Sequence, residues 1–357
     1  MTLEETLRSW VAGGPPDADA LSRRALMGAL AALGTGLVSA LPVALSADGA
    51  SQAPAAPGGE AAAPLPAVEA SAGEVDLAPL DRAFLRLREG LLHYRSAGFT
   101  VGTRARRGAP LPLYMVHAGP GSSRGLEGLV RRLGTDRAVI APDTLGAGDS
   151  AAPDVPVPEV AYYAESVVRT LDALGLARVD YYGSHTGAHI GCELALRWPD
   201  RVRRMVFDGV PVFPAALRAE LLEHYAPPVQ PDDAGRQLAW AWQFVRDMSQ
   251  FFPHYARDAG HRLANAVPSA DALHRSVVEV LKALPTYHLA YQATFRHDIE
   301  RRLPLLRLPV LCIGREGDPL ASYVERAVAL VPGAVPLAVA RADGAAGLAG
   351  AIRRFLA

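Results

Sequence analysis

The chain alternates between short apolar runs and longer stretches in which apolar residues recur with a helical period. The runs at 111–116, 179–184 and 308–313 are mostly apolar, and each ends at a turn-forming segment, which is typical of strands buried on both faces of a sheet. The stretch 162–174 places its apolar residues on one side of a helix. Strands that alternate with helices of this length imply right-handed crossovers. The pattern therefore predicts an α/β domain with a mostly parallel sheet flanked by helices.

Further elements follow from the same two patterns. Strands are expected at 84–88, 91–95, 138–141, 205–208 and 335–339, the first two as a hairpin, and helices at 126–133, 186–197, 323–330 and 348–356. Turns rich in glycine or charged residues follow strands at 117–121, 142–150, 183–187 and 314–319. Because parallel strands end at the same edge of a sheet, we expect the functional site along that edge.

The segment 211–303 departs from this alternation. It is helical in pattern and dense in aromatic residues and histidines. We interpret it as a helical cap inserted into the sheet domain, which divides the core into 77–210 and 304–357. Residues 48–76 are mainly alanine, proline, glycine and glutamate. They carry too little apolar surface to offset the chain entropy of folding, so we expect a disordered linker.

The N-terminal segment 1–47 carries a targeting pattern. Arg23 and Arg24 precede an uncharged run rich in alanine, glycine and leucine, and Ser46 and Ala47 offer small residues for cleavage. This arrangement resembles a twin-arginine (Tat) export signal, which predicts a periplasmic or extracellular protein. The alternatives are an uncleaved membrane anchor, and a cytoplasmic protein in which the segment is an ordinary amphipathic helix. Any membrane contact is expected through this segment alone.

Composition narrows the class of protein. Hydrophobic residues make up 50% of the chain, enough for a sizeable core, and the net charge of −1 gives no sign of a nucleic-acid-binding surface. The two cysteines, Cys192 and Cys312, fall in an expected helix and an expected strand. We interpret them as small core residues, with no disulfide framework and no metal site. The expected partner is a small molecule.

The turn after the strand at 179–184 carries the most informative motif. Its sequence Gly183-Ser184-His185-Thr186-Gly187 has the spacing of a nucleophile elbow, in which a strained turn holds the middle side chain above the sheet. That residue is normally serine, and here it is His185. Because imidazole titrates near neutral pH, it can attack an acyl group or remove a proton from water or from a substrate carbon. The alternative is an elbow that only packs or binds.

Three motifs, at 117–123, 142–150 and 183–187, together resemble the α/β-hydrolase superfamily, and the similarity runs from about residue 84 to the end of the chain. The first is similar to the turn of the haloalkane dehalogenase-like and prolyl iminopeptidase-like branch, and the third resembles a bacterial subset with histidine at the elbow. The resemblance implies an α/β-hydrolase fold with an inserted helical cap. It also implies an oxyanion hole formed by the backbone N–H groups of Gly119 and Thr186, and Asp318 as the acid of the catalytic triad.

The base histidine of that family is missing from its implied place, the loop after the last strand. This loop, 340–347, contains no histidine, and Asp343 is its nearest titratable residue. The usual relay from serine to histidine therefore cannot be assembled. Ser184 is an alternative nucleophile, but it precedes the elbow apex and is expected to point away from the oxyanion hole. Asp208 is an alternative acid, or else it caps the turn that follows it.

The expected substrate pocket lies under the cap. Its candidate lining residues are His117, Trp240, Tyr287, His288 and Tyr291. His117 is also expected to hold the oxyanion turn through a local hydrogen bond, and His288 is a candidate for the missing base. The alternative is that the cap aromatics pack between helices.

These features predict a hydrolase of a small, largely apolar ester or carbonyl compound. His185 is the expected nucleophile or base and Asp318 the orienting acid, and no metal or organic cofactor is implied. Two alternatives stay open. One is an exported, non-catalytic binding protein, favoured by the loss of both the elbow serine and the loop histidine, and the other is a lyase on the same fold.

Overall fold

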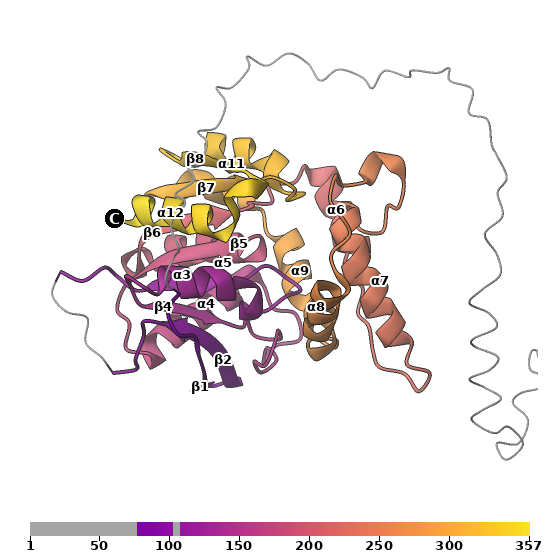
Figure 1. The fold of residues 1–357 in the computed structure, drawn as a ribbon, viewed down its shortest axis with the longest axis horizontal. Coiled ribbons are helices and arrows are strands. Elements are labelled where there is room, and N and C mark those ends of the chain that lie inside the picture. The colour runs from indigo at the N-terminus through magenta and orange to yellow at the C-terminus, as the bar shows by residue number, and fades with distance from the viewer. Residues whose placement is uncertain (1–76, 103–107) are drawn as a thin grey trace, which may run out of the picture. The chain divides into compact units, whose positions relative to one another are not determined.

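The computed structural model describes residues 77–102 and 108–357, and the expected signal segment and linker, 1–76, lie outside the described residues. The described part forms an eight-stranded sheet in the order β1-β2-β4-β3-β5-β6-β7-β8 (Figure 1). β2 pairs antiparallel with β1 and with β4, and the strands from β4 to β8 across the sheet are parallel. The predicted α/β class with a mostly parallel sheet is confirmed.

The strands lie close to their predicted places. Their bounds are β1 Asp81–Leu87, β2 Gly90–Ala97, β3 Leu113–Val116, β4 Val139–Pro142, β5 Val179–Ser184, β6 Val202–Asp208, β7 Val310–Arg315 and β8 Val335–Val339. β6 begins three residues before its predicted start. Its early residue Arg203 is polar and broke the apolar run, but its guanidinium pairs with the buried Asp180 of β5 at 2.7 Å. An ion pair across two strands is invisible to a hydrophobicity pattern.

Two groups of helices accompany the sheet. The core helices are α3 Glu127–Leu133, α4 Val160–Ala173, α5 Thr186–Arg197, α10 Ile299–Arg302, α11 Val324–Leu330 and α12 Gly344–Leu356. Between β6 and β7 come α6 Ala215–His224, α7 Arg236–Gln250, α8 Ala270–Lys282 and α9 Tyr287–Arg296, all within the segment interpreted as a cap. α10 falls in the same segment, but its buried Ile299 packs in a cluster with the sheet. Short 3₁₀ turns are η1 Ser123–Leu126, η2 Pro199–Arg201, η3 Ala259–His261, η4 Leu303–Leu305, η5 Ala321–Tyr323 and η6 Arg341–Asp343. No helix in the described ranges combines the length and apolar character of a membrane span.

The alternation of side chains along each strand divides the core into two layers. On β3, Leu113 and Met115 pack in the cluster that contains α3 and α12, while Tyr114 and Val116 pack in the cluster that contains α4 and α5. Successive strand residues point to opposite faces, so a strand covered on both faces must be apolar throughout. All four residues of β3 are buried, as this arrangement requires.

The helices α6 to α9 have a core of their own. It is largely aromatic and includes Phe213, Tyr225, Phe244, Tyr287 and Tyr291. In Figure 1 these helices lie beyond the ends of the sheet strands, at the right of the view. Aromatic rings bury large areas and pack edge to face, which suits a layer with few aliphatic residues.

Asp143, directly after β4, ties together three segments at the carboxyl edge of the sheet. One carboxylate oxygen accepts hydrogen bonds from the backbone N–H and the hydroxyl of Ser123, at 2.9 and 2.5 Å. The other accepts hydrogen bonds from Nδ1 of His93 at 2.8 Å and from the N–H of Asp149 at 2.9 Å. Burial alone would raise the pKa of Asp143, but the hydrogen bonds from His93, from the Ser123 hydroxyl and from the Asp149 N–H help to outweigh burial and lower the pKa well below its usual range.

Asp143→Asn tests this bracing role. The amide would turn an N–H group toward donors that now share a carboxylate, so we expect a loss of about 3 kcal/mol in the free energy of unfolding at neutral pH. Urea unfolding of full-length protein, followed by circular dichroism, measures it. The exposed Asp200→Asn is the matched control and should leave the free energy unchanged within error.

The difference in the free energy of unfolding between wild type and Asp143→Asn should depend on pH. Because the pKa of Asp143 is depressed in the folded state, its contribution is present above the unfolded-state value of about 3.9 and is lost as the pH falls through the lower folded-state value. The difference between wild type and Asp143→Asn should therefore shrink below about pH 4. A difference that is independent of pH would contradict the bracing role.

Candidate active site

The elbow between β5 and α5 holds His185 in a strained backbone conformation. Its φ of 50° is positive, and among the described residues it is the only non-glycine with a positive φ. The two flanking glycines are required by close approach: a Cβ on Gly183 would lie 2.3 Å from the carbonyl oxygen of Gly187, and one on Gly187 would lie 2.5 Å from that of Val116. The chain thus turns within a single residue, as the G-x-x-x-G spacing predicts, and a strained residue of this kind is often functional.

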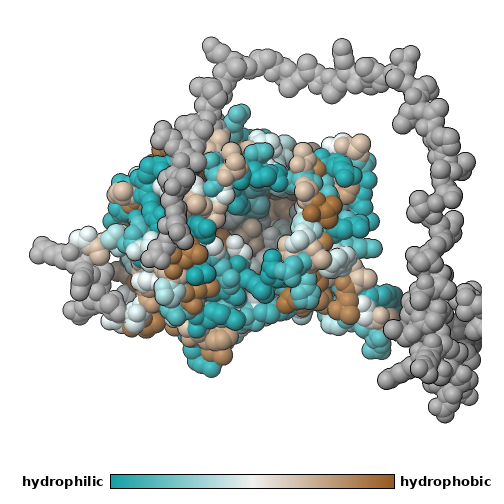
Figure 2. All heavy atoms as spheres, in the orientation of Figure 1, coloured by the Kyte–Doolittle hydropathy of each residue, from teal (hydrophilic) through white to brown (hydrophobic). Residues whose placement is uncertain are grey.

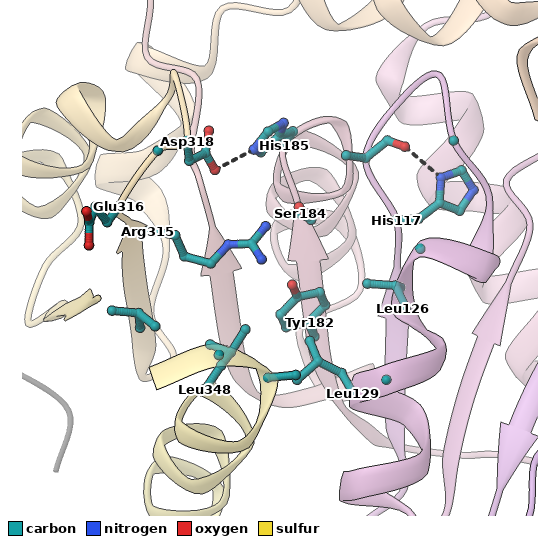
Figure 3. Close-up of a pocket in the computed structure, with 18 of the residues that line it drawn as sticks. His117, Leu126, Leu129, Tyr182, Ser184, His185, Arg315, Glu316, Asp318 and Leu348 are labelled. Carbon is teal, nitrogen blue, oxygen red and sulfur yellow. Dashed lines mark hydrogen bonds and ion pairs between the residues drawn. The ribbon is translucent and has the colours of Figure 1, made fainter. Parts of the chain in front are cut away.

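The imidazole of His185 is hydrogen-bonded to the carboxylate of Asp318. Nε2 lies 2.8 Å from Oδ2, the His185 side chain is 26% exposed and the Asp318 side chain 6%. Asp318 is itself held by the backbone N–H of Leu320, which donates to Oδ1 at 2.8 Å. A Cβ on Gly209 would lie 2.6 Å from the His185 ring and 2.8 Å from Asp318, so only glycine leaves room for this pair. Figure 3 shows the pair at the edge of the sheet.

This contact determines which nitrogen of His185 is available. Burial raises the pKa of Asp318, but the hydrogen bonds from His185 and from the Leu320 N–H help to outweigh burial and lower it, so the carboxylate is ionised at neutral pH. An ionised carboxylate only accepts, and Nε2 therefore carries the proton. Nδ1 keeps its lone pair, and no described residue hydrogen-bonds to it. The arrangement resembles the histidine–aspartate half of a catalytic triad with the two ring nitrogens exchanged, because in the triad the acid bonds Nδ1 and Nε2 is the base.

The backbone donors implied for the oxyanion hole lie side by side. Gly119 is in the turn after β3 and Thr186 is the first residue of α5, and a Cβ on Gly119 would lie 3.4 Å from Oγ1 of Thr186. No described residue accepts a hydrogen bond from the backbone N–H of either one. Both N–H groups are therefore free to donate to a negatively charged oxygen.

His117 supports the oxyanion turn through both ring nitrogens. Nδ1 donates to the carbonyl of Ala118 at 2.9 Å, and Nε2 accepts the N–H of Thr144 at 3.0 Å. Burial, the largest effect, lowers the pKa of His117 despite the nearby charge of Asp143. A neutral ring with both nitrogens engaged positions its neighbours, and it has no free lone pair with which to act as a base.

A cavity of about 690 Å³ borders His185. It lies between the carboxyl ends of the central strands and the helices α3 and α12, where Leu129 and Leu348 line it (Figure 3). In the orientation of Figure 1 the surface is hollowed near these two helices (Figure 2). The volume suits a small organic ligand.

The loop after β8 forms part of the wall of this cavity. Ala340, Arg341, Gly344 and Ala345 line it, on the side from which the family's base histidine would reach the elbow. Asp343, the nearest titratable residue, does not line it, because its carboxylate accepts the N–H of Ala340 at 2.8 Å and closes η6. The imidazole of His185 instead reaches Asp318 from the elbow itself.

Ser184 and Asp208 lie beneath His185. Ser184 is buried and lines the same large cavity, whereas the small pocket that includes Gly119 and Thr186 does not include it. Asp208 is fully buried at the end of β6. Its carboxylate makes no hydrogen bond to the imidazole of His185 among the described contacts. Instead it accepts a hydrogen bond from the Tyr182 hydroxyl at 2.5 Å and forms an ion pair with Nε of Arg315 at 3.0 Å. Burial raises the pKa of Asp208, opposed by Arg315.

Arg315 is a site residue that the sequence patterns missed. It ends β7 and lines the cavity beside Asp318. A charged residue at the carboxyl end of an otherwise apolar strand was the available signal, because such positions face the functional edge of a parallel sheet.

The predicted cap residues lie apart from the large cavity. Trp240 stacks on Phe244 with ring centroids 4.9 Å apart, and the Tyr287 hydroxyl donates to a backbone carbonyl. Tyr291 lies over Gly119, and Tyr287 lines a pocket of about 20 Å³ next to Gly119 and Thr186. His288 is half-buried on α9, and burial lowers its pKa. A substrate-binding role for these four residues stays a prediction.

One cluster in the described ranges has donor atoms spaced for a metal ion: His93, Asp143 and Asp149. Its donors are already engaged within the protein. Arg82 donates to Nε2 of His93 at 3.1 Å and to Asp149 at 3.1 Å, and Lys282 donates to Asp149 at 2.9 Å. Two cationic side chains thus already pair with these donors, so we interpret the cluster as structural.

The sequence of this chain is similar to that of known hydrolases. Residues 112–329, more than half of the chain, match the family model described as alpha/beta hydrolase fold. A 2-hydroxymuconate semialdehyde hydrolase of Pseudomonas putida is 38% identical over 105 residues, which are 29% of this chain and 37% of the relative. The chain therefore matches little more than a third of the length of that curated relative.

Solved structures show the same architecture. Epoxide hydrolase A of Mycobacterium thermoresistibile has a TM-score of 0.58 at 20% identity, with 78% of this chain and 98% of that chain covered. The enol-lactonase of Burkholderia xenovorans has a TM-score of 0.53 at 19% identity, with 77% and 99% covered. These likenesses show the fold, and together with the family match they establish that the chain belongs to the alpha/beta hydrolase family.

Proposed function

We propose that the protein is a hydrolase of a small ester- or carbonyl-containing substrate in which His185 acts as the general base and Asp318 orients it. The observation that carries the proposal is the 2.8 Å contact between Nε2 of His185 and Asp318, at an elbow that borders a cavity. A histidine paired with a buried carboxylate and holding a free second nitrogen is the arrangement that activates water or a hydroxyl in hydrolases.

The reaction needs no nucleophilic side chain, because water is the nucleophile. Nδ1 of His185 removes a proton from water as the water oxygen attacks the carbonyl carbon, and Asp318 stabilises the imidazolium that results. The tetrahedral intermediate then collapses, the bond to the leaving oxygen breaks, and the imidazolium returns its proton to that oxygen. An ester and one water give an acid and an alcohol.

The oxyanion of the intermediate would be held by the N–H groups of Gly119 and Thr186. Both are free of other acceptors among the described residues, and each such donor is typically worth about 3 kcal/mol in the transition state. His117 holds the turn that carries Gly119, through its bonds to Ala118 and Thr144. The names of the curated relative and of the structural neighbours, a semialdehyde hydrolase, an enol-lactonase and an epoxide hydrolase, support hydrolytic chemistry.

A second candidate function is ligand binding without turnover. The observation in its favour is that the loop after β8 contains no histidine, so that a cavity lies between this loop and His185. In this case the pair of His185 and Asp318 would contribute polar contacts to a ligand that leaves chemically unchanged.

Replacement of His185 tests the proposed base. In a panel of p-nitrophenyl esters from acetate to octanoate, His185→Ala and His185→Gln should lower kcat/KM at least about a hundredfold, because general base catalysis contributes roughly 10²- to 10⁴-fold. His274→Ala, which removes an exposed histidine on α8, is the control and should keep wild-type activity. Full activity of His185→Ala would contradict the proposal, and a wild type inactive on every substrate would favour the binding protein.

The nucleophile is examined in the same samples by intact mass after reaction with an organophosphate probe. A general base forms no stable adduct with it, so we expect the unmodified mass. An adduct mapped to Ser184 by peptide analysis would replace the proposed mechanism by serine catalysis. A hydrolytically labile adduct on His185 would instead make His185 the nucleophile.

Asp318→Asn tests the orienting acid. The amide N–H would donate to Nε2 and move the imidazole proton to Nδ1, where it blocks the lone pair. We expect kcat to fall on the order of a thousandfold or more, with little change in KM, as for the equivalent change in serine proteases. Steady-state kinetics measure this, with Asp200→Asn as the control. An unchanged kcat would show that Asp318 is not part of the machinery.

A further inference from the structure

The cavity beside His185 is not the space that the sequence patterns suggested. Under the cap, the pocket next to Gly119 and Thr186 has about 20 Å³, and a pocket of about 510 Å³ between the 120–125 turn and the helices α7 and α8 is not lined by His185. The cavity bordered by α3 and α12, which His185 does line, has about 690 Å³. Its apolar walls are Leu126 and Leu129 on one side and Leu348 on the other. A ligand of more than a few atoms that meets His185 in this structure would therefore lie between α3 and α12.

Arg315 enters the same cavity from the end of β7. Figure 3 shows its side chain passing beneath His185, with the guanidinium directed toward Ser184. Its Nε lies 3.0 Å from Asp208, whose other oxygen accepts the Tyr182 hydroxyl. The guanidinium is thus anchored at its inner edge by a fully buried carboxylate.

The outer edge of this guanidinium is free. No described residue accepts a hydrogen bond from Nη1 or Nη2 of Arg315, and 41% of the side chain is exposed. A planar pair of N–H donors matches the two oxygens of a carboxylate.

The other charged groups that line the cavity are already engaged. Asp318 is bonded to His185 and to the N–H of Leu320. Glu316 accepts the backbone N–H of Arg341, and the Arg341 guanidinium donates to Asn265 at 2.8 Å. Asp318 and Glu316 offset Arg315 and Arg341 in formal charge, so attraction to an anion must come from the free donors of Arg315 and not from a net positive field.

We propose that the cavity between α3 and α12 binds a small carboxylate ligand through Nη1 and Nη2 of Arg315, beside His185. The proposal deepens the proposed function and its substrate part rests on it: the substrate is then an ester or carbonyl compound that also carries a carboxylate. The apolar walls formed by Leu126, Leu129 and Leu348 contact the body of the ligand.

Binding of benzoate and of its neutral analogue benzamide to full-length protein, measured by isothermal titration calorimetry, tests the site without requiring turnover. We expect benzoate to bind about tenfold more tightly than benzamide, because charge-assisted pairs are stronger than neutral ones. Arg315→Gln should reduce the preference to about one. The exposed Arg301→Gln, on α10, is the matched control and should keep it. Equal binding of the two compounds by wild type would overturn the proposal.

Arg315→Gln also leaves Asp208 without its cation and is a risk to folding. Arg315→Lys keeps a positive charge near Asp208 but lacks the planar pair of donors, so a folded Arg315→Lys should bind benzoate several-fold more weakly with benzamide unaffected. Unchanged benzoate binding in this variant would overturn the role of Arg315.

The position of the ligand is tested from the opposite wall. Ala345→Trp, on α12, places an indole in the cavity while Arg315 and Asp208 keep their own side chains, and it should abolish benzoate binding. Ala342→Trp, on an exposed neighbour that does not line the cavity, should not. Benzoate binding that survives Ala345→Trp would place the ligand elsewhere.

The substrate part is tested by kinetics. Mono-p-nitrophenyl glutarate should be hydrolysed with a kcat/KM about tenfold above that of p-nitrophenyl butyrate, and Arg315→Lys should remove the difference mainly through KM. Equal values for the two esters would overturn the carboxylate substrate. Preserved benzoate binding without turnover of any ester would contradict the proposed hydrolase while supporting the binding site.

Discussion

The site depends on the close approach of α5 to the sheet at the turn after β5. Because Gly183 and Gly187 carry no side chain, the first turn of α5 lies directly against the end of β5 and against Val116 of β3. That contact forces the one residue between strand and helix into a positive φ and lifts its side chain above the sheet. The position of His185, the free N–H of Thr186 and the nearness of the oxyanion turn all follow from this one constraint.

A second set of contacts holds the loops around the elbow. Asp143 joins the segments that carry His93, Ser123 and Asp149, and His117 links its own turn to Thr144. The loops at the carboxyl edge would otherwise be free to move independently. The hydrogen bonds that join these loops involve buried polar groups, and breaking them would leave those groups without a partner, which costs free energy. The oxyanion turn is thus positioned by neutral and ionised groups that take no part in the proposed chemistry.

The elbow carries the type of side chain that the family usually supplies from a distant loop. In a triad, a serine occupies the elbow and a histidine from a distant loop bridges it to the acid. Here the imidazole stands at the elbow and reaches Asp318 directly, and Gly209 leaves the space that the ring needs. The loop after β8 then has no imidazole to contribute, and a cavity lies between it and His185. Arg315 faces this cavity while Asp208 balances its charge from behind.

Much of the fold was readable from the chain because it is encoded locally. Continuous apolar runs, a helical period and turns after strands are properties of neighbouring residues, and β8 was predicted at its observed bounds, 335–339. The elbow could be recognised for the same reason, since its glycines and its strained residue lie within five positions. The start of β6 was missed because Arg203 is stabilised by Asp180, a partner on another strand.

The chemistry of the site was decided by contacts between distant parts of the chain. His185 and Asp318 are 133 residues apart, and only the parallel order of β5, β6 and β7 brings their turns together. The pairing of Arg315 with Asp208, the packing of the cap aromatics and the location of the cavity depend likewise on which faces meet after folding. The strands, the helices and the residue at the elbow could be read from the chain, because they depend on local backbone geometry. Which nitrogen of His185 is free, and which cavity its side chain borders, depends on contacts that form only on folding.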